Sequence, residues 1–273
     1  MPELPEVETI RRQLKEHVIG LEVTSIEFPD RGSKVLRGAI EDLIGMKFFS
    51  TRRFGKLLVV DLQKNEKKLS LCIHLKMTGR LTLVDSQEEI PSHTHVILVL
   101  HNRKKLVFSD MRQFGFVHVI STSEVSQIPF INTLGKEPLK DFTFSDFEKI
   151  CRHSKRPIKN LLLDQRKIAG IGNIYACECL WIAKIDPRKE SSSIDQVKLH
   201  ELFQAIEAVL QEGIARGGAS DNTYRNLLGG KGKYQNFFKV YARASKPCLR
   251  CKTNILRIAL AGRGTFFCPD CQK

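Results

Sequence analysis

Residues 248–271 read CLRCKTNILRIALAGRGTFFCPDC, and this stretch holds two cysteine pairs with 16 residues between them. In a C-x2-C pair both thiolates can face one ion, and two such pairs complete a tetrahedron that has no open position. The spacing lies within the range of four-thiolate zinc ribbons. We therefore expect one structural Zn²⁺, with free thiols or a disulfide pair as the alternatives. The predicted ligands are Cys248, Cys251, Cys268 and Cys271.

The segment around these pairs is strongly basic. Residues 239–273 have a net charge of +7, half of the +14 of the whole chain. Such an excess indicates a polyanionic partner, with nucleic acid ahead of an anionic membrane, and a merely solvated basic face as the alternative. Arg263 lies between Gly262 and Gly264. These glycines predict a tight turn that presents the guanidinium of Arg263 to a phosphate.

The rest of the composition is that of an ordinary globular protein. The 273 residues suggest one large or two ordinary domains, and 42% of them are hydrophobic and 27% charged. No run approaches the roughly 18 apolar residues of a membrane span. The first residues, MPELPEVET, are acidic and lack the apolar core of a secretory signal. Eight cysteines in 273 residues are too few for a disulfide scaffold, and a reducing intracellular compartment fits better.

The hydrophobic pattern changes along the chain. Apolar residues three and four apart predict a helix from about Pro5 to Val18, and helical spacing returns after about residue 144. Between these regions, short strands at regular intervals predict a β-sandwich or barrel. The fold class is therefore α+β. The expected strands are 21–28, 57–62, 69–75, 81–84, 95–100, 105–108 and 114–120, and the expected later helices are 144–153, 158–163, 174–183 and 197–215. The domains we expect are 1–130, 131–237 and 238–273.

The second residue, Pro2, carries a possible chemistry of its own. Removal of Met1 would give Pro2 a secondary α-amine with a pKa of about 8, well below the roughly 10.4 of lysine. Attack of such an amine on the aldehydic carbon of a sugar gives an iminium ion, which is the electron sink that covalent catalysis needs. Glu3 is adjacent and suited to proton transfer. Taken alone, a proline here is more often only the start of a helix.

Six motifs taken together carry a family resemblance. They are MPELPEVET, Lys56, HLKMTG at 74–79, DMRQFG at 110–115, GIGNIYACE at 170–178 and AGRGTFFCPDCQK at 261–273. In this order and over the whole chain, they resemble the formamidopyrimidine-DNA glycosylases. The resemblance implies a helix and β-sandwich lobe, a helix–two-turns–helix lobe with a zinc finger, and DNA held between them. It also implies a bifunctional DNA glycosylase/AP lyase for oxidised purines in base excision repair.

The resemblance also implies roles for individual residues. Pro2 would attack C1′ of the damaged nucleotide and Glu3 would act as acid and base, after which β- and δ-elimination cut the strand. Lys56 and Arg263 would hold phosphates beside the lesion. An extruded base leaves a hole in the stack, which Met77, Arg112 and Phe114 would fill. The further DNA contacts that the resemblance implies are His74, His93, Lys159, Asn173 and Tyr175.

Some positions depart from the family and leave alternatives open. Lys76 and Thr78 flank Met77. The family often has Arg or Gly before this methionine and Glu or Ser after it. The segment 217–237, with Ser220, Asp221 and several glycines, corresponds to the lesion-recognition loop. Leu4 stands where the endonuclease VIII family usually has Gly, which favours purine over pyrimidine lesions.

We expect a monomer in the bacterial cytoplasm, associated with the nucleoid, that binds damaged duplex DNA and no membrane. The alternatives are an oxidised-pyrimidine glycosylase and, if Met1 is retained, a non-catalytic DNA-binding protein.

Overall fold

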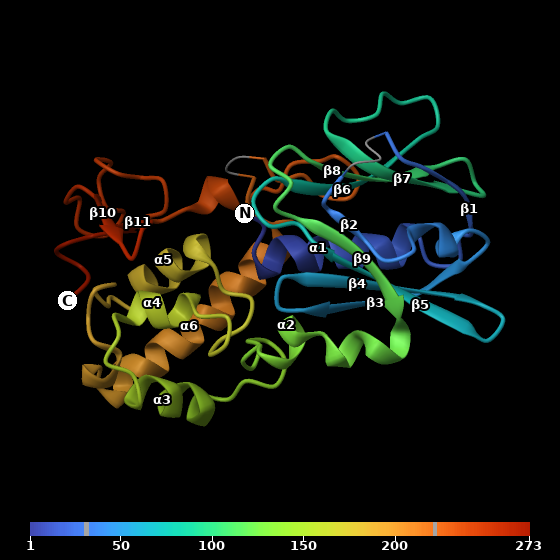
Figure 1. The fold of residues 1–273 in the computed structure, drawn as a ribbon. Helices are drawn as coiled ribbons and strands as arrows, with labels where there is room; N and C mark the ends of the chain where they lie inside the picture. Colours follow the sequence, from blue (N-terminus) through green and yellow to red (C-terminus); the bar gives the residue numbers. More distant parts are fainter. Residues whose placement is uncertain (30–32, 221–222) are drawn as a thin grey trace. The chain divides into compact units, whose positions relative to one another are not determined.

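The computed structural model describes residues 1–29, 33–220 and 223–273 (Figure 1). The chain divides into two compact units. The first comprises residues 1–132 and 216–233, and the second comprises residues 133–215 and 234–273. No helix in the described part of the chain is both long enough and apolar enough to cross a membrane.

The first unit contains helix α1 and two β-sheets that share one hydrophobic core. Helix α1 (Leu4–His17) buries Val7, Ile10 and Leu14 in this core, which confirms the predicted apolar face. Side chains of both sheets complete the core, so the unit is a sandwich and not a closed barrel. The four-stranded sheet has the order β1 (Val23–Glu27), β7 (Thr94–Leu100), β8 (Lys105–Asp110) and β6 (Gly79–Val84). The five-stranded sheet has the order β2 (Leu36–Arg37), β9 (Phe116–Ser121), β5 (Lys67–His74), β4 (Leu57–Lys64) and β3 (Lys47–Phe54).

The first unit also contains three short helical segments. They are η1 (Ile40–Leu43), η2 (Thr122–Gln127) and α2 (Pro129–Asn132). Strand β3 was not predicted, because it carries three basic residues and has little apolar alternation. It tolerates these charges because it lies at the edge of its sheet and pairs only with β4 there.

Residues 216–233 belong to the first unit by their packing, although the sequence grouped them with the helical domain 131–237. The amide of Ala219 donates to Glu6 Oε1 at 2.7 Å, and the Tyr224 hydroxyl donates to the Glu6 carbonyl at 3.2 Å. Further along, the amide of Leu227 donates to Gln13 Oε1 at 2.9 Å. These long-range bonds to α1 hold both ends of the described loop. Asp221 lies outside the described residues.

The second unit is helical and ends in a small hairpin. Its helices are α3 (Phe144–Arg152), α4 (Ile158–Leu163), α5 (Asn173–Ile182) and α6 (Gln196–Ala215), with short turns η3 (Ser191–Ser193) and η4 (Tyr234–Phe237). Eight of the ten residues of α5 are buried, so this helix forms the centre of the unit. Asp195 caps α6 by accepting the amide of Lys198 at 2.8 Å.

The C-terminal hairpin pairs β10 (Leu256–Leu260) with β11 (Arg263–Phe267). Its turn consists of Ala261 and Gly262, which both have positive φ, at 47° and 71°. Two consecutive left-handed residues suit the right-handed twist of a two-residue hairpin. The predicted tight turn is therefore present directly before Arg263, which pairs with Leu260 across it and begins β11.

Candidate functional site

The N-terminal residues that the sequence predicts to be catalytic are fixed at the start of α1. Pro2 and Glu3 are both buried, and Met1 precedes them. The amide of Glu3 donates to Glu6 Oε2 at 2.7 Å. The second oxygen of the Glu6 carboxylate accepts the amide of Ala219. One buried carboxylate therefore holds both the N-terminal residues and the 216–233 segment of the same unit.

A cluster of charges on α1 anchors the turn that carries Lys56. Glu8 accepts hydrogen bonds from Arg11 and Arg12, and Arg53 of β3 donates to it at 3.1 Å. Burial opposes ionisation of Glu8, but these bonds and the charge of Arg53 outweigh it and lower the pKa of Glu8 to about 2. Arg53 also donates to the carbonyl of Gly55 at 2.8 Å, so the residue before Lys56 is held in place. Lys56 itself is only 6% exposed.

Lys56 lies in the turn directly before β4, and His74 is the last residue of the neighbouring strand β5. Leu57, which follows Lys56, pairs with His74 between β4 and β5. Burial, together with the charges of Lys76 and Lys56, lowers the pKa of His74 to about 3, so the ring is neutral at physiological pH. Its Nδ1 accepts the amide of Lys76 at 3.1 Å. The proton of the neutral ring is then on Nε2, which leaves a donor for an anionic oxygen.

The three predicted void fillers come from two loops that Asp110 joins. The Asp110 carboxylate accepts the hydroxyl of Thr78, and it accepts the amides of Arg112 at 3.2 Å and Gly115 at 2.7 Å. Met77 is 40% exposed and Phe114 is 56% exposed, although both are apolar. The Arg112 guanidinium lies 4.6 Å from the centre of the Phe114 ring. A single buried carboxylate thus holds the two loops that carry these exposed apolar side chains and the cation.

His93 lies at an open polar pocket beside these loops. Its backbone has a φ of 57°, and its carbonyl accepts the amide of Asp110 at 3.0 Å. The residues that line the pocket are Thr78, Arg80, Ser92, His93, Ser109, Met111 and Thr223. Thr78, whose type departs from the family, therefore contributes to this pocket while its hydroxyl is bonded to Asp110.

In the second unit, the turn before α5 meets the C-terminal hairpin. Asn173, the first residue of α5, donates through Nδ2 to the carbonyl of Gly264 at 3.0 Å. Lys159 on α4 donates to the same carbonyl at 3.3 Å and to Thr265 Oγ1 at 2.7 Å. The Asn173 Oδ1 is buried without a hydrogen-bond partner. The structure thus brings Lys159 and Asn173 together at the start of β11, directly beside Arg263.

Two predicted binding residues are less accessible than the sequence suggested. Lys159 is fully buried, and its described bonds go to the hairpin. Tyr175 is also fully buried and stacks on Tyr234 with 5.2 Å between ring centres. A side chain at Gly213 would come within 2.6 Å of the Tyr175 ring, so only glycine fits there. The structure gives Tyr175 a packing role in the core of the unit, whereas Arg263 is exposed.

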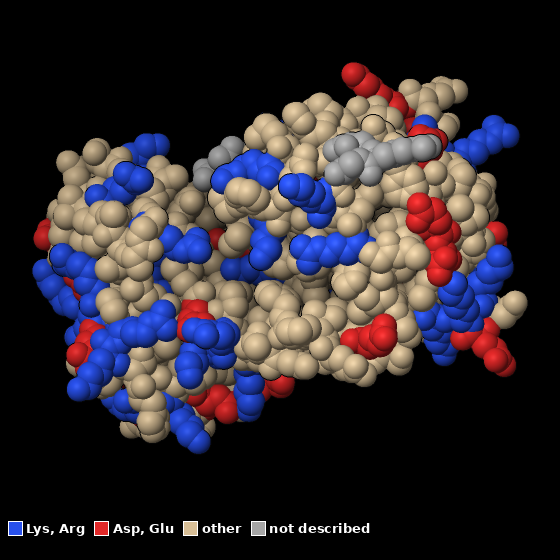
Figure 2. All heavy atoms as spheres, viewed as in Figure 1, with Lys and Arg blue, Asp and Glu red and all other residues tan. Residues whose placement is uncertain are grey.

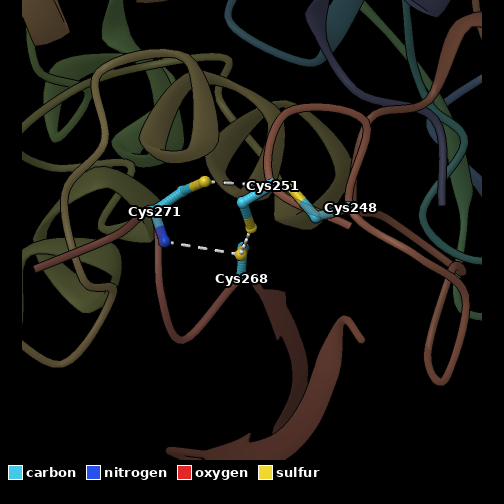
Figure 3. A group of neighbouring side chains, drawn as sticks. All are labelled: Cys248, Cys251, Cys268 and Cys271. Atoms are coloured by element: carbon cyan, nitrogen blue, oxygen red, sulfur yellow. Dashed lines mark hydrogen bonds between the residues drawn. The ribbon is translucent and has the colours of Figure 1, made fainter. Parts of the chain in front are cut away.

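The four predicted metal ligands converge at the end of the chain (Figure 3). Their sulfur atoms all lie within 4.8 Å of one another. The Sγ atoms of Cys248 and Cys271 are 3.9 Å apart, and those of Cys251 and Cys268 are 3.4 Å apart. A tetrahedral ion with Zn–S bonds of about 2.3 Å requires edges of roughly 3.8 Å. Four thiolates at these separations fit one Zn²⁺ and leave no position for a substrate.

Basic side chains are prominent on the surface of the second unit. Figure 2 shows many Lys and Arg side chains, and fewer Asp and Glu, over the visible face of the helical and zinc-finger residues. An open pocket here is lined by Arg156, Asn160, Leu163, Asp164, Arg166, Ala261 and Arg263. Asp164 pairs with Arg156 at 2.9 Å and Arg166 at 3.4 Å, so one acid lies beside three arginines. The excess of positive charge suits a phosphate backbone.

Two residues that organise these sites were not assigned by the sequence. Asp110 and Glu6 both lie inside motifs that the sequence singled out, yet their partners are distant or in later loops. Asp110 is the last residue of the buried apolar strand β8 and comes five residues before a glycine. An acid at such a strand end, able to accept the amides of the next turn, is the signal that could have identified it.

Comparisons with known proteins match the whole chain. The profile described as "Formamidopyrimidine-DNA glycosylase N-terminal domain" matches residues 1–117, and "Formamidopyrimidine-DNA glycosylase H2TH domain" matches residues 134–225. Residues 245–273 match "Zinc finger found in FPG and IleRS". A formamidopyrimidine-DNA glycosylase of Listeria innocua is 38% identical over 279 residues that cover 100% of both chains. One from Streptococcus pyogenes is 39% identical over 278 residues, covering 100% of this chain and 99% of the other.

Solved structures agree with the sequence comparisons. A variant of the Lactococcus lactis protein in complex with DNA containing Fapy-dG has a TM-score of 0.91 and 36% identity, with 100% of both chains covered. The wild-type Lactococcus lactis protein in complex with DNA containing an oxidised pyrimidine has a TM-score of 0.90 and 35% identity, again over 100% of both chains.

Proposed function

The chain belongs to the formamidopyrimidine-DNA glycosylase family, and from this premise we propose how its own residues perform the reaction of that family. The protein is a DNA glycosylase and AP lyase that acts on oxidised purines in damaged duplex DNA during base excision repair. The observation that carries the residue assignment is the buried Pro2–Glu3 pair at the start of α1, held by the Glu6 carboxylate.

We assign the covalent chemistry to Pro2 and the proton transfers to Glu3. Once Met1 is removed, the Pro2 nitrogen forms a bond to C1′ of the damaged nucleotide, and the bond between C1′ and the base breaks. The amine loses its proton, the bond between C1′ and the ring oxygen O4′ opens as O4′ takes up a proton, and the resulting iminium ion withdraws electrons from C2′. Loss of a C2′ proton then expels the 3′ phosphate oxygen, and a second elimination expels the 5′ phosphate oxygen. Glu3 is the group that donates and accepts protons in these steps.

The other residues of the first unit bind and position the DNA. Lys56, in the turn before β4, and the neutral His74, at the end of the adjacent strand β5, supply an ammonium and an imidazole N–H to the phosphates beside the lesion. Met77 and Phe114 present exposed apolar surface that fills the space of the extruded base, and Arg112 supplies hydrogen-bond donors for the base left unpaired. The pocket at His93 is our candidate for contacts with the extruded nucleotide.

In the second unit we assign Asn173 and Arg263 to phosphate contacts. The start of α5 offers backbone N–H groups to an anion, and Arg263 adds a charged fork at the adjacent hairpin. The buried Lys159 serves the same site by fixing Gly264 and Thr265. The zinc ion is structural, and Cys248, Cys251, Cys268 and Cys271 hold it. When bound, the ion fixes the fold of the basic hairpin.

Trapping with borohydride tests the assignment of Pro2. Mature protein is mixed with duplex DNA containing 8-oxoguanine, and borohydride reduces the iminium ion to a stable covalent adduct. The wild-type protein and Pro5→Ala should give the adduct, whereas Pro2→Gly and Glu3→Gln should give little or none. Mass spectrometry of the protein establishes that Met1 is absent. No adduct from mature wild-type protein would refute the role of Pro2.

A second candidate activity is excision of oxidised pyrimidines. It is favoured by the similar Lactococcus lactis protein, which was solved with DNA containing an oxidised pyrimidine. We propose that oxidised purines are the better substrates here, because Leu4 replaces the Gly usual in the endonuclease VIII family. Single-turnover rates on 8-oxoguanine opposite cytosine and on thymine glycol compare the two directly. Faster excision of thymine glycol would reverse the proposed preference.

The cellular setting follows from the substrate. The similar proteins are bacterial, and in bacteria the chromosomal DNA lies in the cytoplasm. We therefore propose that the protein acts there, associated with the nucleoid, and that one copy of the chain binds one lesion as a monomer. Sedimentation of the protein with a lesion-containing duplex tests this stoichiometry.

A further inference from the structure

The last turn of α5 abuts the first cysteine pair of the zinc finger. Trp181 is the only tryptophan of the chain and is the next-to-last residue of this helix. It is 6% exposed, and its indole Nε1 lies 3.4 Å from Cys248 Sγ in hydrogen-bonding geometry. An indole N–H is a donor only. The Cys248 sulfur is therefore the acceptor of this bond.

Arg250 fixes the indole in this position. Its guanidinium carbon lies 3.7 Å from the centre of the Trp181 ring, which is a close cation–π contact. The same guanidinium donates to the carbonyl of Trp181 at 2.6 Å and to that of Ile182 at 3.0 Å. The last carbonyls of a helix lack partners within it and favour a nearby cation. Arg250, which lies inside the cysteine pair, thus caps α5 and covers its tryptophan.

The surroundings of this contact are apolar. Trp181 and Cys248 belong to one buried cluster with Cys177, Val240, Ile255 and Cys268. In an apolar setting a thiolate is poorly solvated, and each N–H donor that reaches it offsets part of that cost. The backbone amide of Arg250 lies 3.5 Å from the same sulfur and adds a second donor. The charge of the Cys248 thiolate is therefore stabilised by a side chain of another element, the indole of Trp181 on α5.

We propose that Trp181 is a positioning residue for the zinc site, which holds the Cys248 thiolate through its indole N–H and so slows loss of the metal. The same helix meets the finger again at its other end, where Asn173 donates to Gly264. Zinc retention by Trp181 thereby supports the position of the phosphate-binding turn. The inference depends on the four-thiolate site and not on the glycosylase reaction. The role of Trp181 and the proposed catalytic roles can therefore fail independently.

Zinc release from the full-length, zinc-loaded protein tests the proposal. Trp181→Phe keeps an aromatic ring beneath Arg250 but removes the N–H donor. Contacts behind metal ligands are typically worth 10- to 100-fold in metal affinity, so release to a chromogenic chelator should be about tenfold faster in this variant. Ile182→Val is the matched control, because Ile182 packs against the same cluster and its side chain has no donor. Release at the wild-type rate from Trp181→Phe, or equal acceleration in both variants, would overturn the proposal.

Two spectroscopic measurements separate this bond from general packing. In the cobalt-substituted protein, the sulfur-to-cobalt charge-transfer band should move to lower energy in Trp181→Phe, since a thiolate that loses a donor releases its electrons more easily. An unchanged band would count against the bond. The second measurement needs no variant and so does not depend on folding of Trp181→Phe. The single indole N–H signal of the zinc-loaded wild-type protein should exchange slowly with solvent, and rapid exchange would refute the contact.

Discussion

The ammonium of Lys159 lies 2.7 Å from the hydroxyl of Thr265, and both side chains belong to residues that are fully buried. Lys159 is on α4, whereas Thr265 is 106 residues later on β11 of the zinc finger. A buried lysine requires close acceptors, because an uncompensated charge is costly away from water. This pair therefore joins α4 to the basic hairpin, which carries Arg263, one of the residues we propose for phosphate binding.

Removing the Thr265 hydroxyl should destabilise the second unit. Thr265→Val keeps the shape of the side chain but takes an acceptor from the buried ammonium. We expect the free energy of unfolding to fall by about 1–3 kcal/mol, the usual cost of an unsatisfied buried polar group. Urea unfolding measures this loss. Thr24→Val, at an exposed position of β1, is the control and should change stability by less than about 0.5 kcal/mol. Equal stability of the two variants would contradict the role of the pair.

Asp110→Asn should slow excision while leaving the fold intact. The carboxylate accepts from Thr78, Arg112 and Gly115, and an amide keeps only one acceptor oxygen for them. Small displacements of Met77, Arg112 and Phe114 should then lower kcat/KM on 8-oxoguanine DNA by roughly 10- to 100-fold. Single-turnover kinetics measure the effect, and circular dichroism verifies the fold. Asp61→Asn, which alters a buried acid bonded to Arg52 on β3, should leave kcat/KM unchanged.

Local patterns of the sequence predicted most of the elements. Helix α1 and the strands β4 to β9 follow apolar spacing that each segment carries within itself, and the cysteine spacing predicted the metal cluster. Strand β3 escaped prediction because an edge strand accepts charges that hide its alternation. Its pairing with β4 is a tertiary contact that no local pattern shows.

The site was predicted as a set of residues but not as an arrangement. The resemblance named Lys159, Asn173 and Arg263 separately, whereas their convergence on Gly264 and Thr265 depends on packing between distant segments. The grouping of residues 216–233 with α1 likewise depends on the bonds to Glu6. Burial of Tyr175 depends on Gly213, which lies on a different helix. Contacts of this kind are set by the three-dimensional packing and leave little trace in the local sequence.

The Glu8 cluster should make stability depend on pH in the acidic range. The pKa of Glu8 is lowered to about 2 in the folded protein, from an unfolded value of about 4.3. Its contribution is therefore fully present above about pH 4.3 and is lost as the pH falls towards 2, at about 2–3 kcal/mol in total. Urea unfolding of wild type and Glu8→Gln at pH 7 and pH 3 measures this. The difference between the two proteins should shrink at pH 3, and metal loss at low pH affects both alike. A constant difference would contradict the assignment.

Removal of zinc should abolish binding to DNA. The finger carries half of the net charge of the chain, and its hairpin holds Arg263 beside Asn173. Without the metal no common ion holds the four cysteines together, and the hairpin loses its anchor. Fluorescence anisotropy with a labelled lesion-containing duplex, before and after chelation, measures the loss, and added Zn²⁺ should restore binding. Undiminished binding after metal analysis has verified zinc removal would refute the structural role.

Arg263 should contribute one phosphate contact that depends on salt. Neutralising a phosphate releases about 0.9 counterion on duplex DNA, so Arg263→Gln should reduce the slope of log K against log[salt] by about 1. Affinity should fall by a similar factor for damaged and undamaged duplexes, because the backbone carries no sequence information. Arg263→Lys keeps the charge and should keep the slope, while losing the affinity that a forked guanidinium adds. Since Arg263 begins β11 directly after the turn and is exposed, neither substitution disturbs a buried contact. An unchanged slope in Arg263→Gln would place the residue away from the phosphates.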